Sequence, residues 1–160
     1  MKEVISLHIG QAGAGIGNSF WELLSHEHSI DQKGFKSAEK EEDENEQNDF
    51  FEKMFLKNEE GRFRPRAIFI DLDSDAINEI RTGPLENLYG GENFLSGKSD
   101  TGGNFALGKS TNQQNFVDSC VDRIKAEVEK CENFDGFLIF NSVGGGTGSG
   151  LTSLISEKLA

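Results

Sequence analysis

The chain has 160 residues, of which 35% are hydrophobic and 28% charged, and its formal net charge is −12 at pH 7. This length suits about one domain with a core of its own, and the negative charge argues against binding to nucleic acid or to anionic membranes. The two cysteines form no CxxC pair and the opening MKEVISLHIG is no signal peptide, so we expect a cytoplasmic protein with unreactive thiols.

A strand, a glycine turn and a helix are the first elements that the sequence predicts. Residues 4–9, VISLHI, are largely apolar, as in an interior strand of a parallel sheet. GQAGAGIG follows at residues 10–17, and apolar residues then recur at helical spacing from Ile16 to about His28. These glycines suit either the first turn of a dinucleotide-binding fold or close packing of the helix on the sheet, and the segment alone favours neither.

An acidic segment separates this unit from the second strand. Residues 37–60 hold ten Asp and Glu against three Lys, and residues 39–46 contain no apolar side chain. A stretch of this composition cannot bury enough apolar surface to join a core. We therefore expect a solvated acidic loop over about 37–60.

The second predicted strand, AIFI at residues 67–70, ends in acids. Asp71 and Asp73 alternate, so one can face a crevice while the other caps the short helix that Ile77 and Ile80 indicate. Helix capping is the simpler explanation for either aspartate. The functional alternative is a contact to Mg²⁺, direct or through another ligand of the ion.

Less regular sequence follows. Residues 94–95 predict a short third strand and residues 96–103 a loop. Ser110 or Thr111 can cap the next helix, in which apolar residues recur at spacings of four, three and four over residues 117–128.

The most informative stretch is GFLIFNSVGGGTGSGL at residues 136–151. Its apolar part predicts a buried strand over residues 137–140, and GGGTGSG joins that strand to a final helix from about Gly150. Glycine lets backbone N–H groups approach an anion, and the helix N-terminus adds unpaired donors and a positive dipole end. The loop has no lysine and matches neither a P-loop nor GxGxxG. We interpret it as a phosphate cradle in which Thr147 and Ser149 supply hydroxyl donors.

Four strands alternating with helices predict an α/β fold, a Rossmann-like doubly wound parallel sheet ordered roughly 3-2-1-4. Ligands bind such sheets beyond the carboxyl ends of the strands. One crevice can therefore collect the loops at residues 10–13, 71–73, 100–104 and 144–149. The fourth strand would be an edge with exposed backbone and apolar groups, so we expect the free chain to be only marginally soluble.

Three segments carry a family resemblance: GQAGAGIGNSFWELLSHEHSID, RAIFIDLDSDAINEIRTG and GFLIFNSVGGGTGSGLTSLISEKLA. With these in order, the chain resembles the tubulin family along nearly its whole length, and GGGTGSG is specific for tubulins and their bacterial division relatives. SLHIGQAG and the C-terminal segment look more like α-tubulin, while HSID and RTGPLENL lean toward β-tubulin. The resemblance implies that residues 1–160 are the N-terminal part of a divergent α-tubulin-like GTP-binding domain.

This resemblance implies a GTP-binding structural subunit of microtubules, in the cytoplasmic cytoskeleton, with Mg²⁺ beside the phosphates. The implied partners are a β-tubulin-like subunit and the microtubule lattice. The implied nucleotide-binding residues are Gly10, Gln11, Ala12, Asp71, Asp100, Asn104, Ser142, Gly145, Gly146, Thr147 and Gly148. Gln11 is also implied as a contact to the metal.

Three positions have further meaning in this comparison. Asp73 stands where α-tubulins carry a magnesium-associated Glu, and because it is one methylene shorter, its metal contact would be through water. Gly103 replaces the first residue of an Asn-Asn pair, which leaves Asn104 alone. Lys40 stands where α-tubulins carry an acetylatable lysine, which implies a possible modification site in an unusually acidic setting.

The resemblance implies a tubulin-type GTPase, yet it places the catalytic acid and the segments that hold guanine and ribose beyond these residues. One alternative is a non-hydrolysing tubulin-like binding or regulatory module with a weakened GTP site, which Asp73 and Gly103 favour. A nicotinamide-dependent oxidoreductase would need GxGxxG followed by a ribose-binding acid, and that spacing is absent.

Overall fold

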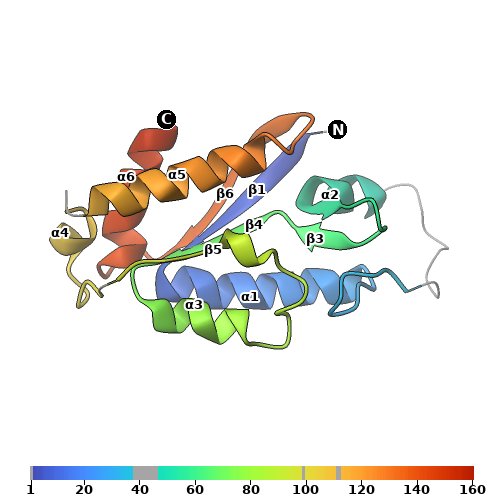
Figure 1. Cartoon of the computed structure of the whole chain (residues 1–160), viewed down its shortest axis with the longest axis horizontal. Helices are drawn as coiled ribbons and strands as arrows, with labels where there is room; N and C mark the ends of the chain where they lie inside the picture. Colours follow the sequence, from blue (N-terminus) through green and yellow to red (C-terminus); the bar gives the residue numbers. More distant parts are fainter. Residues whose placement is uncertain (1, 38–46, 99, 111–112) are drawn as a thin grey trace.

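A four-stranded sheet forms the middle layer of the fold in a computed structural model that describes residues 2–37, 47–98, 100–110 and 113–160 (Figure 1). The strands are β1 (Glu3–Ile9), β4 (Ala67–Asp71), β5 (Phe94–Ser96) and β6 (Phe134–Asn141). They pair in parallel in the order β5-β4-β1-β6. The expected doubly wound α/β fold and its 3-2-1-4 strand order are therefore confirmed.

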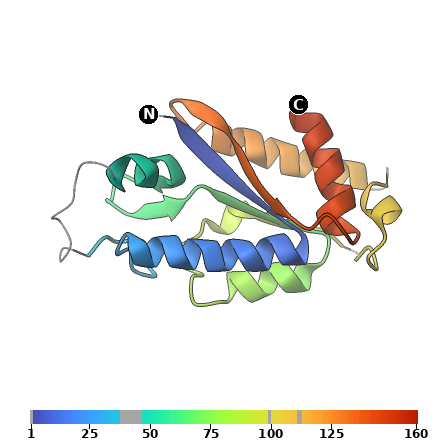
Figure 2. The same cartoon turned by 180° about the vertical axis from the view of Figure 1, so that it is seen from behind.

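Helices cover both faces of the sheet (Figures 1 and 2). They are α1 (Gly10–Glu27) and α3 (Ser74–Arg81) on one face and α5 (Gln114–Val128) and α6 (Thr152–Leu159) on the other. Because successive side chains of a strand point to opposite sides, each face has its own apolar cluster. Phe69 shares one cluster with Trp21 of α1 and Ile77 of α3, and Leu7 shares the other with Ile124 of α5.

The expectation of one acidic loop over 37–60 is wrong in its second half. That half contains α2 (Gln47–Met54) and β2 (Phe55–Lys57), and β2 pairs antiparallel with β3 (Phe63–Pro65). Phe51, Met54 and Phe55 are no more than 4% exposed. The three side chains belong to the apolar cluster on the α1 face of the sheet. Their burial lets this segment join the core although charged residues surround them. Residues 38–46, and with them Lys40, lie outside the described residues, as does Thr111.

The glycines of residues 10–17 lie inside α1, which begins directly at Gly10 and not after a turn. A Cβ at Gly13 would overlap the Phe140 carbonyl, and one at Gly17 would overlap the ring of His8. Close packing of helix on sheet, one of the two explanations left open, is therefore confirmed for these two glycines. Gly10 differs, because its φ of 77° is in the left-handed region that favours glycine.

His8 links β1 to the elements on both sides of it. Its ring stacks between Phe69 and Phe140, with centroid separations of 4.7 and 4.9 Å. Trp21 Nε1 donates a hydrogen bond of 3.0 Å to His8 Nε2. Burial lowers the pKa of His8 to about 3. The imidazole is therefore neutral at physiological pH and acts as a core residue.

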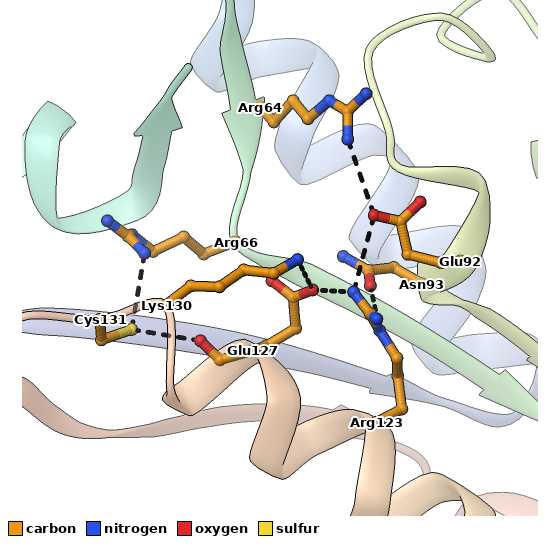
Figure 3. A network of polar contacts seen from close by, with 8 residues as sticks. All are labelled: Arg64, Arg66, Glu92, Asn93, Arg123, Glu127, Lys130 and Cys131. Atoms are coloured by element: carbon orange, nitrogen blue, oxygen red, sulfur yellow. Dashed lines mark hydrogen bonds and ion pairs between the residues drawn. The ribbon is translucent and has the colours of Figure 1, made fainter. Parts of the chain in front are cut away.

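A polar network connects α5 to β3, which precedes β4, and to the residues that directly precede β5 (Figure 3). Arg123 pairs with Glu127 one turn later on α5, and its Nε donates to Asn93 Oδ1 at 2.8 Å. Glu92 lies 3.6 Å from Arg123 and 3.7 Å from Arg64. These contacts join α5, β3 and the turn before β5 at the amino end of the sheet.

Arg66 anchors the same end of the sheet. Its Nη2 donates to Glu3 Oε1 at 2.5 Å. Its Nη1 donates to Cys131 Sγ at 3.5 Å (Figure 3). Burial raises the pKa of Cys131 and raises that of Cys120 to about 12. Both thiols are free and protonated, in agreement with the expected lack of reactivity. Among the described residues no helix is both long and apolar enough to cross a membrane.

Candidate functional site

A cavity of about 450 Å³ lies at the carboxyl end of the sheet. The four loops that the sequence predicted to meet in one crevice all contribute to its wall, so their convergence is confirmed. The residues that line it are Gln11, Ala12, Asp71, Asp73, Asp75, Ala76, Glu79, Asp100, Thr101, Gly103, Ser142, Gly144, Gly145, Gly146, Thr147 and Gly148. Nine of the eleven residues assigned to the nucleotide by resemblance are among them.

Gly10 and Asn104 are the two that do not line the cavity, and both act behind it. A Cβ at Gly10 would come within 2.9 Å of the backbone nitrogen of Gly148, so this glycine lets α1 approach the glycine loop. Asn104 Oδ1 accepts from Ala106 N at 2.9 Å and thereby caps the short helix α4 (Phe105–Gly108). The sequence did not predict α4.

The glycine loop offers backbone donors to the cavity. Gly145 has a φ of 82°, and a Cβ at Gly146 or Gly148 would overlap Thr101 or Ser142. Among the described residues, the backbone N–H groups of residues 144–148 have no acceptor. The first backbone N–H after them that donates to this loop is that of Gly150, which bonds Gly146 O at 2.8 Å. Several N–H groups of one short loop are thus free to bind an anion.

The start of α1 adds a second set of donors. Ile9 at the N-cap provides no side-chain acceptor, and the first turn contains no acid. Its N–H groups and the positive end of the helix dipole therefore remain uncompensated where Gln11 and Ala12 line the cavity. A helix start of this kind stabilises a bound anion.

Thr147 and Ser149 are the hydroxyls predicted as phosphate donors. Ser149 Oγ donates to the carbonyl of Gly145 inside the loop and so supports the shape of the loop. Thr147 lines the cavity, and its side chain opposes the effect of burial on the pKa of Asp71. Donation from these two hydroxyls to phosphate stays a prediction.

The walls of the cavity are acidic. Five carboxylates line it, and among the described residues no lysine or arginine does. Burial raises the pKa of Asp71, although hydrogen bonds from the backbone of Asp73 and Leu72 oppose this effect. A highly charged anion would meet favourable backbone donors on one side and repulsive carboxylates on the other, so it would need a cation with it.

Asp73 is the helix cap that the sequence offered as the simpler explanation. Its side chain accepts from Asp75 N at 3.0 Å at the start of α3. Capping is thus confirmed, while metal binding stays a prediction. Within the part of the chain that the structure describes, no three His, Cys, Asp or Glu side chains are grouped so as to hold a metal ion. A cation here would depend on ligand oxygens and water for most of its coordination.

A smaller cavity of about 370 Å³ adjoins the first and shares Gln11, Ala76 and Glu79 with it. It lies between α1 and α3, where Asn18 and Gly15 contribute to its wall. Tyr89 donates to Asn18 Oδ1 at 3.2 Å and fixes this side chain. Sequence periodicity gave no sign of this space, because it depends on how far apart the two helices pack.

Comparison with known proteins identifies the family of the chain. Residues 3–160 match the family described as Tubulin/FtsZ family, GTPase domain. The chain belongs to the Tubulin/FtsZ family. This family assignment confirms the resemblance on which the site residues were first named, and it covers the glycine loop, both predicted aspartates and the start of α1.

Similar proteins of this tubulin-family chain include α-tubulins. It is 43% identical over 159 residues to the tubulin alpha-8 chain of Caenorhabditis elegans and 43% identical over 161 residues to the tubulin alpha-1 chain of Schizosaccharomyces pombe. It is 45% identical over 162 residues to the tubulin alpha chain of Dictyostelium discoideum. These alignments cover 99% of the chain but only 34–35% of each relative, so the chain spans about one third of their length.

Proposed function

We propose that this chain binds the phosphates of GTP with Mg²⁺, as the phosphate-binding half of a nucleotide site in an α-tubulin-like cytoskeletal subunit. The observation that carries the proposal is the set of unpaired N–H groups over residues 144–148, which face a cavity together with the start of α1. Backbone donors and a helix start are the features that bind phosphate in other nucleotide-binding folds.

Magnesium fits the chemistry of the cavity wall. Oxygen ligands are what Mg²⁺ prefers, and the ion usually keeps several waters while it binds phosphate oxygens. Asp73 and Gln11 would hold it, through water in the case of Asp73. When bound, the ion would neutralise charge on the phosphates opposite the five carboxylates.

In a complete subunit, the same chain would assemble with a β-tubulin-like partner into cytoplasmic microtubules. The support is the family membership and the 43–45% identity to proteins named as α-tubulin chains. Co-sedimentation of the chain with polymerised tubulin, compared with its behaviour alone, tests this part.

The decisive experiment is a titration of the chain with GTP, ATP and NAD, with and without Mg²⁺. We expect Mg²⁺-dependent binding that prefers the two nucleoside triphosphates over NAD, because the donors described here address phosphate groups. Gly146→Val should lower the affinity for GTP more than tenfold, because its side chain would overlap Thr101 and close the loop. Gly136→Val is the matched control, since a Cβ at Gly136 meets nothing within 4 Å and the residue lies on β6 away from the cavity.

Two results would count against the proposal. Equal affinity for the three nucleotides would remove the claim for a triphosphate site. Unchanged binding by Gly146→Val, with circular dichroism showing a folded chain, would remove the glycine loop from the site.

A second candidate is a tubulin-like regulatory module that binds GTP weakly and does not hydrolyse it. Two observations favour it: Asp73 is engaged as a helix cap, and Gly103 offers no side chain to the cavity at a φ of 74°. Affinity for Mg²⁺-tripolyphosphate, measured beside the matching N-terminal segment of an α-tubulin, separates the candidates. An affinity equal to that of this control would exclude the weakened site of the module.

A further inference from the structure

Hydroxyl groups in the cavity wall differ in whether their proton is free. Of the described residues, Thr101, Ser142 and Thr147 bring hydroxyls to the wall. Ser142 Oγ donates to the carbonyl of Gly144 at 2.9 Å, and the side chain of Thr147 interacts with Asp71 and opposes the effect of burial on the pKa of that carboxyl. Thr101 lines the cavity, and its hydroxyl has no hydrogen-bond partner among the described residues. This hydroxyl therefore has a proton to donate to a ligand.

The position of Thr101 is fixed by its surroundings. The residue is only 3% exposed, its N–H donates to Asp100 Oδ1 at 2.6 Å, and its carbonyl accepts from Asn104 N at 3.0 Å. Gly146 lies directly against it, since a Cβ at Gly146 would come 2.5 Å from Thr101 Cβ. The free hydroxyl is thus held beside the glycine loop, whose backbone N–H groups are unpaired.

The chemistry of the wall gives this hydroxyl a particular use. The five carboxylates there accept hydrogen bonds and repel an anion, so a donor must come from the backbone or from a neutral side chain. Other members of the loop over 100–104 do not provide one: Gly103 has no side chain, and Asn104 does not line the cavity.

We propose that the Thr101 hydroxyl donates a hydrogen bond to a phosphate oxygen of the bound nucleotide and completes the donor set that the glycine loop begins. The inference rests on the proposed function, which it deepens by naming a side chain that binds phosphate. No covalent step is involved, and the hydroxyl keeps its proton.

Three variants test this role. Thr101→Val removes the hydroxyl at nearly constant volume, and Thr101→Ser keeps it. The control is Thr152→Val, because the hydroxyl of Thr152 is buried without a partner and the residue does not line the cavity. Calorimetric titration with Mg²⁺-GTP and with Mg²⁺-tripolyphosphate, the phosphate chain alone, measures binding for each variant and for the unmodified chain.

Hydrogen bonds to a charged acceptor are worth more than neutral ones, so we expect Thr101→Val to lower affinity for both probes about tenfold or more. Thr101→Ser should stay within about threefold of the unmodified chain, and Thr152→Val should be unchanged. The inference is overturned if Thr101→Val binds like the unmodified chain, or if Thr101→Ser loses as much affinity as Thr101→Val.

The same titrations separate this inference from the proposed function. If the unmodified chain binds tripolyphosphate and Thr101→Val loses this binding, but the affinity does not depend on Mg²⁺, then the magnesium part of the proposed function fails and the role of Thr101 stands. If binding depends on Mg²⁺ and Thr101→Val has no effect, the proposed function stands and the role of Thr101 fails. An unmodified chain that binds neither probe overturns both.

Discussion

Polar groups are paired with one another at the amino end of the sheet and left unpaired at the carboxyl end. At the amino end, charges of both signs alternate: Glu3 accepts from Arg66, and Glu127 accepts from Arg123 and from Lys130 at 2.7 Å. At the carboxyl end, five carboxylates share one cavity without a basic neighbour in its described wall, and the N–H groups of residues 144–148 have no recorded acceptor. Paired groups stabilise the fold, whereas fixed unpaired groups are available to a ligand.

Cavity size alone does not show which end of the sheet holds the functional site. A larger space of about 690 Å³ lies at the amino end, between the β2–β3 pair and the start of β1. Its wall mixes acids such as Glu3 and Glu132 with bases such as Lys57 and Lys130. The cavity of about 450 Å³ at the carboxyl end is the better candidate for function, because the charged side chains of its described wall are all acidic and it is lined by the glycine loop.

Breaking the pairing at the amino end should have the largest effect on stability. Arg66 and Glu3 are 8% and 11% exposed in their side chains, so Arg66→Ala leaves a buried carboxylate without its partner. We expect a loss of about 3–5 kcal/mol in unfolding free energy, measured by urea denaturation. Arg64→Ala, which removes a half-exposed pair 3.7 Å from Glu92, should lose less than about 1 kcal/mol. Equal losses would contradict the importance given to burial.

Between the two ends, His8 makes stability depend on pH. Its pKa is near 3 in the fold and 6.5 in the unfolded chain, so its contribution is complete above pH 6.5 and is lost as the pH falls toward 3. We expect unfolding free energy to fall by about 2 kcal/mol from pH 7 to pH 5. His8→Gln should flatten this slope. His28→Gln is the control, because burial also lowers the pKa of the more exposed His28; a larger change in the control would disprove the assignment.

At the carboxyl end, Asp73 allows capping to be separated from metal binding. Asp73→Ala should lower stability by about 1 kcal/mol through loss of the cap, whereas Asp73→Asn keeps an acceptor for Asp75 N and should be nearly neutral. If the carboxylate also positions Mg²⁺, Asp73→Asn will weaken the dependence of GTP affinity on Mg²⁺. Thermal melts and Mg²⁺ titrations measure the two effects, and identical behaviour of both variants in the melts would remove the capping role.

The β6 edge of the sheet gives the prediction with the smallest expected effect on stability. Among the described residues β6 pairs only with β1, and its Leu138 and Ile139 are 39% and 36% exposed. We predict concentration-dependent self-association of the free chain. Ile139→Lys should reduce it and should change the free energy of unfolding by no more than about 0.5 kcal/mol. Sedimentation velocity measures it, and a chain that stays monomeric at all concentrations would contradict this expectation.

Local patterns explain what the sequence could predict. The apolar run before GGGTGSG and the acids after AIFI each lie within a few residues, so strand order, the convergence of four loops and the cap at Asp73 were all predictable. The helix α2 was missed because its buried residues Phe51 and Met54 are few among many charges. A free hydroxyl at Thr101 cannot be seen in sequence at all, since it depends on which neighbours already engage the other hydroxyls.

The direct passage from β1 into α1 at Gly10 has an experimental benefit. His8 lies two residues before this junction and accepts a hydrogen bond from Trp21, the single tryptophan of the chain. Any shift of α1 against β1 on anion binding would change the surroundings of this indole. The emission of one native fluorophore therefore tests whether the helix moves when the cavity is filled, with no dye attached.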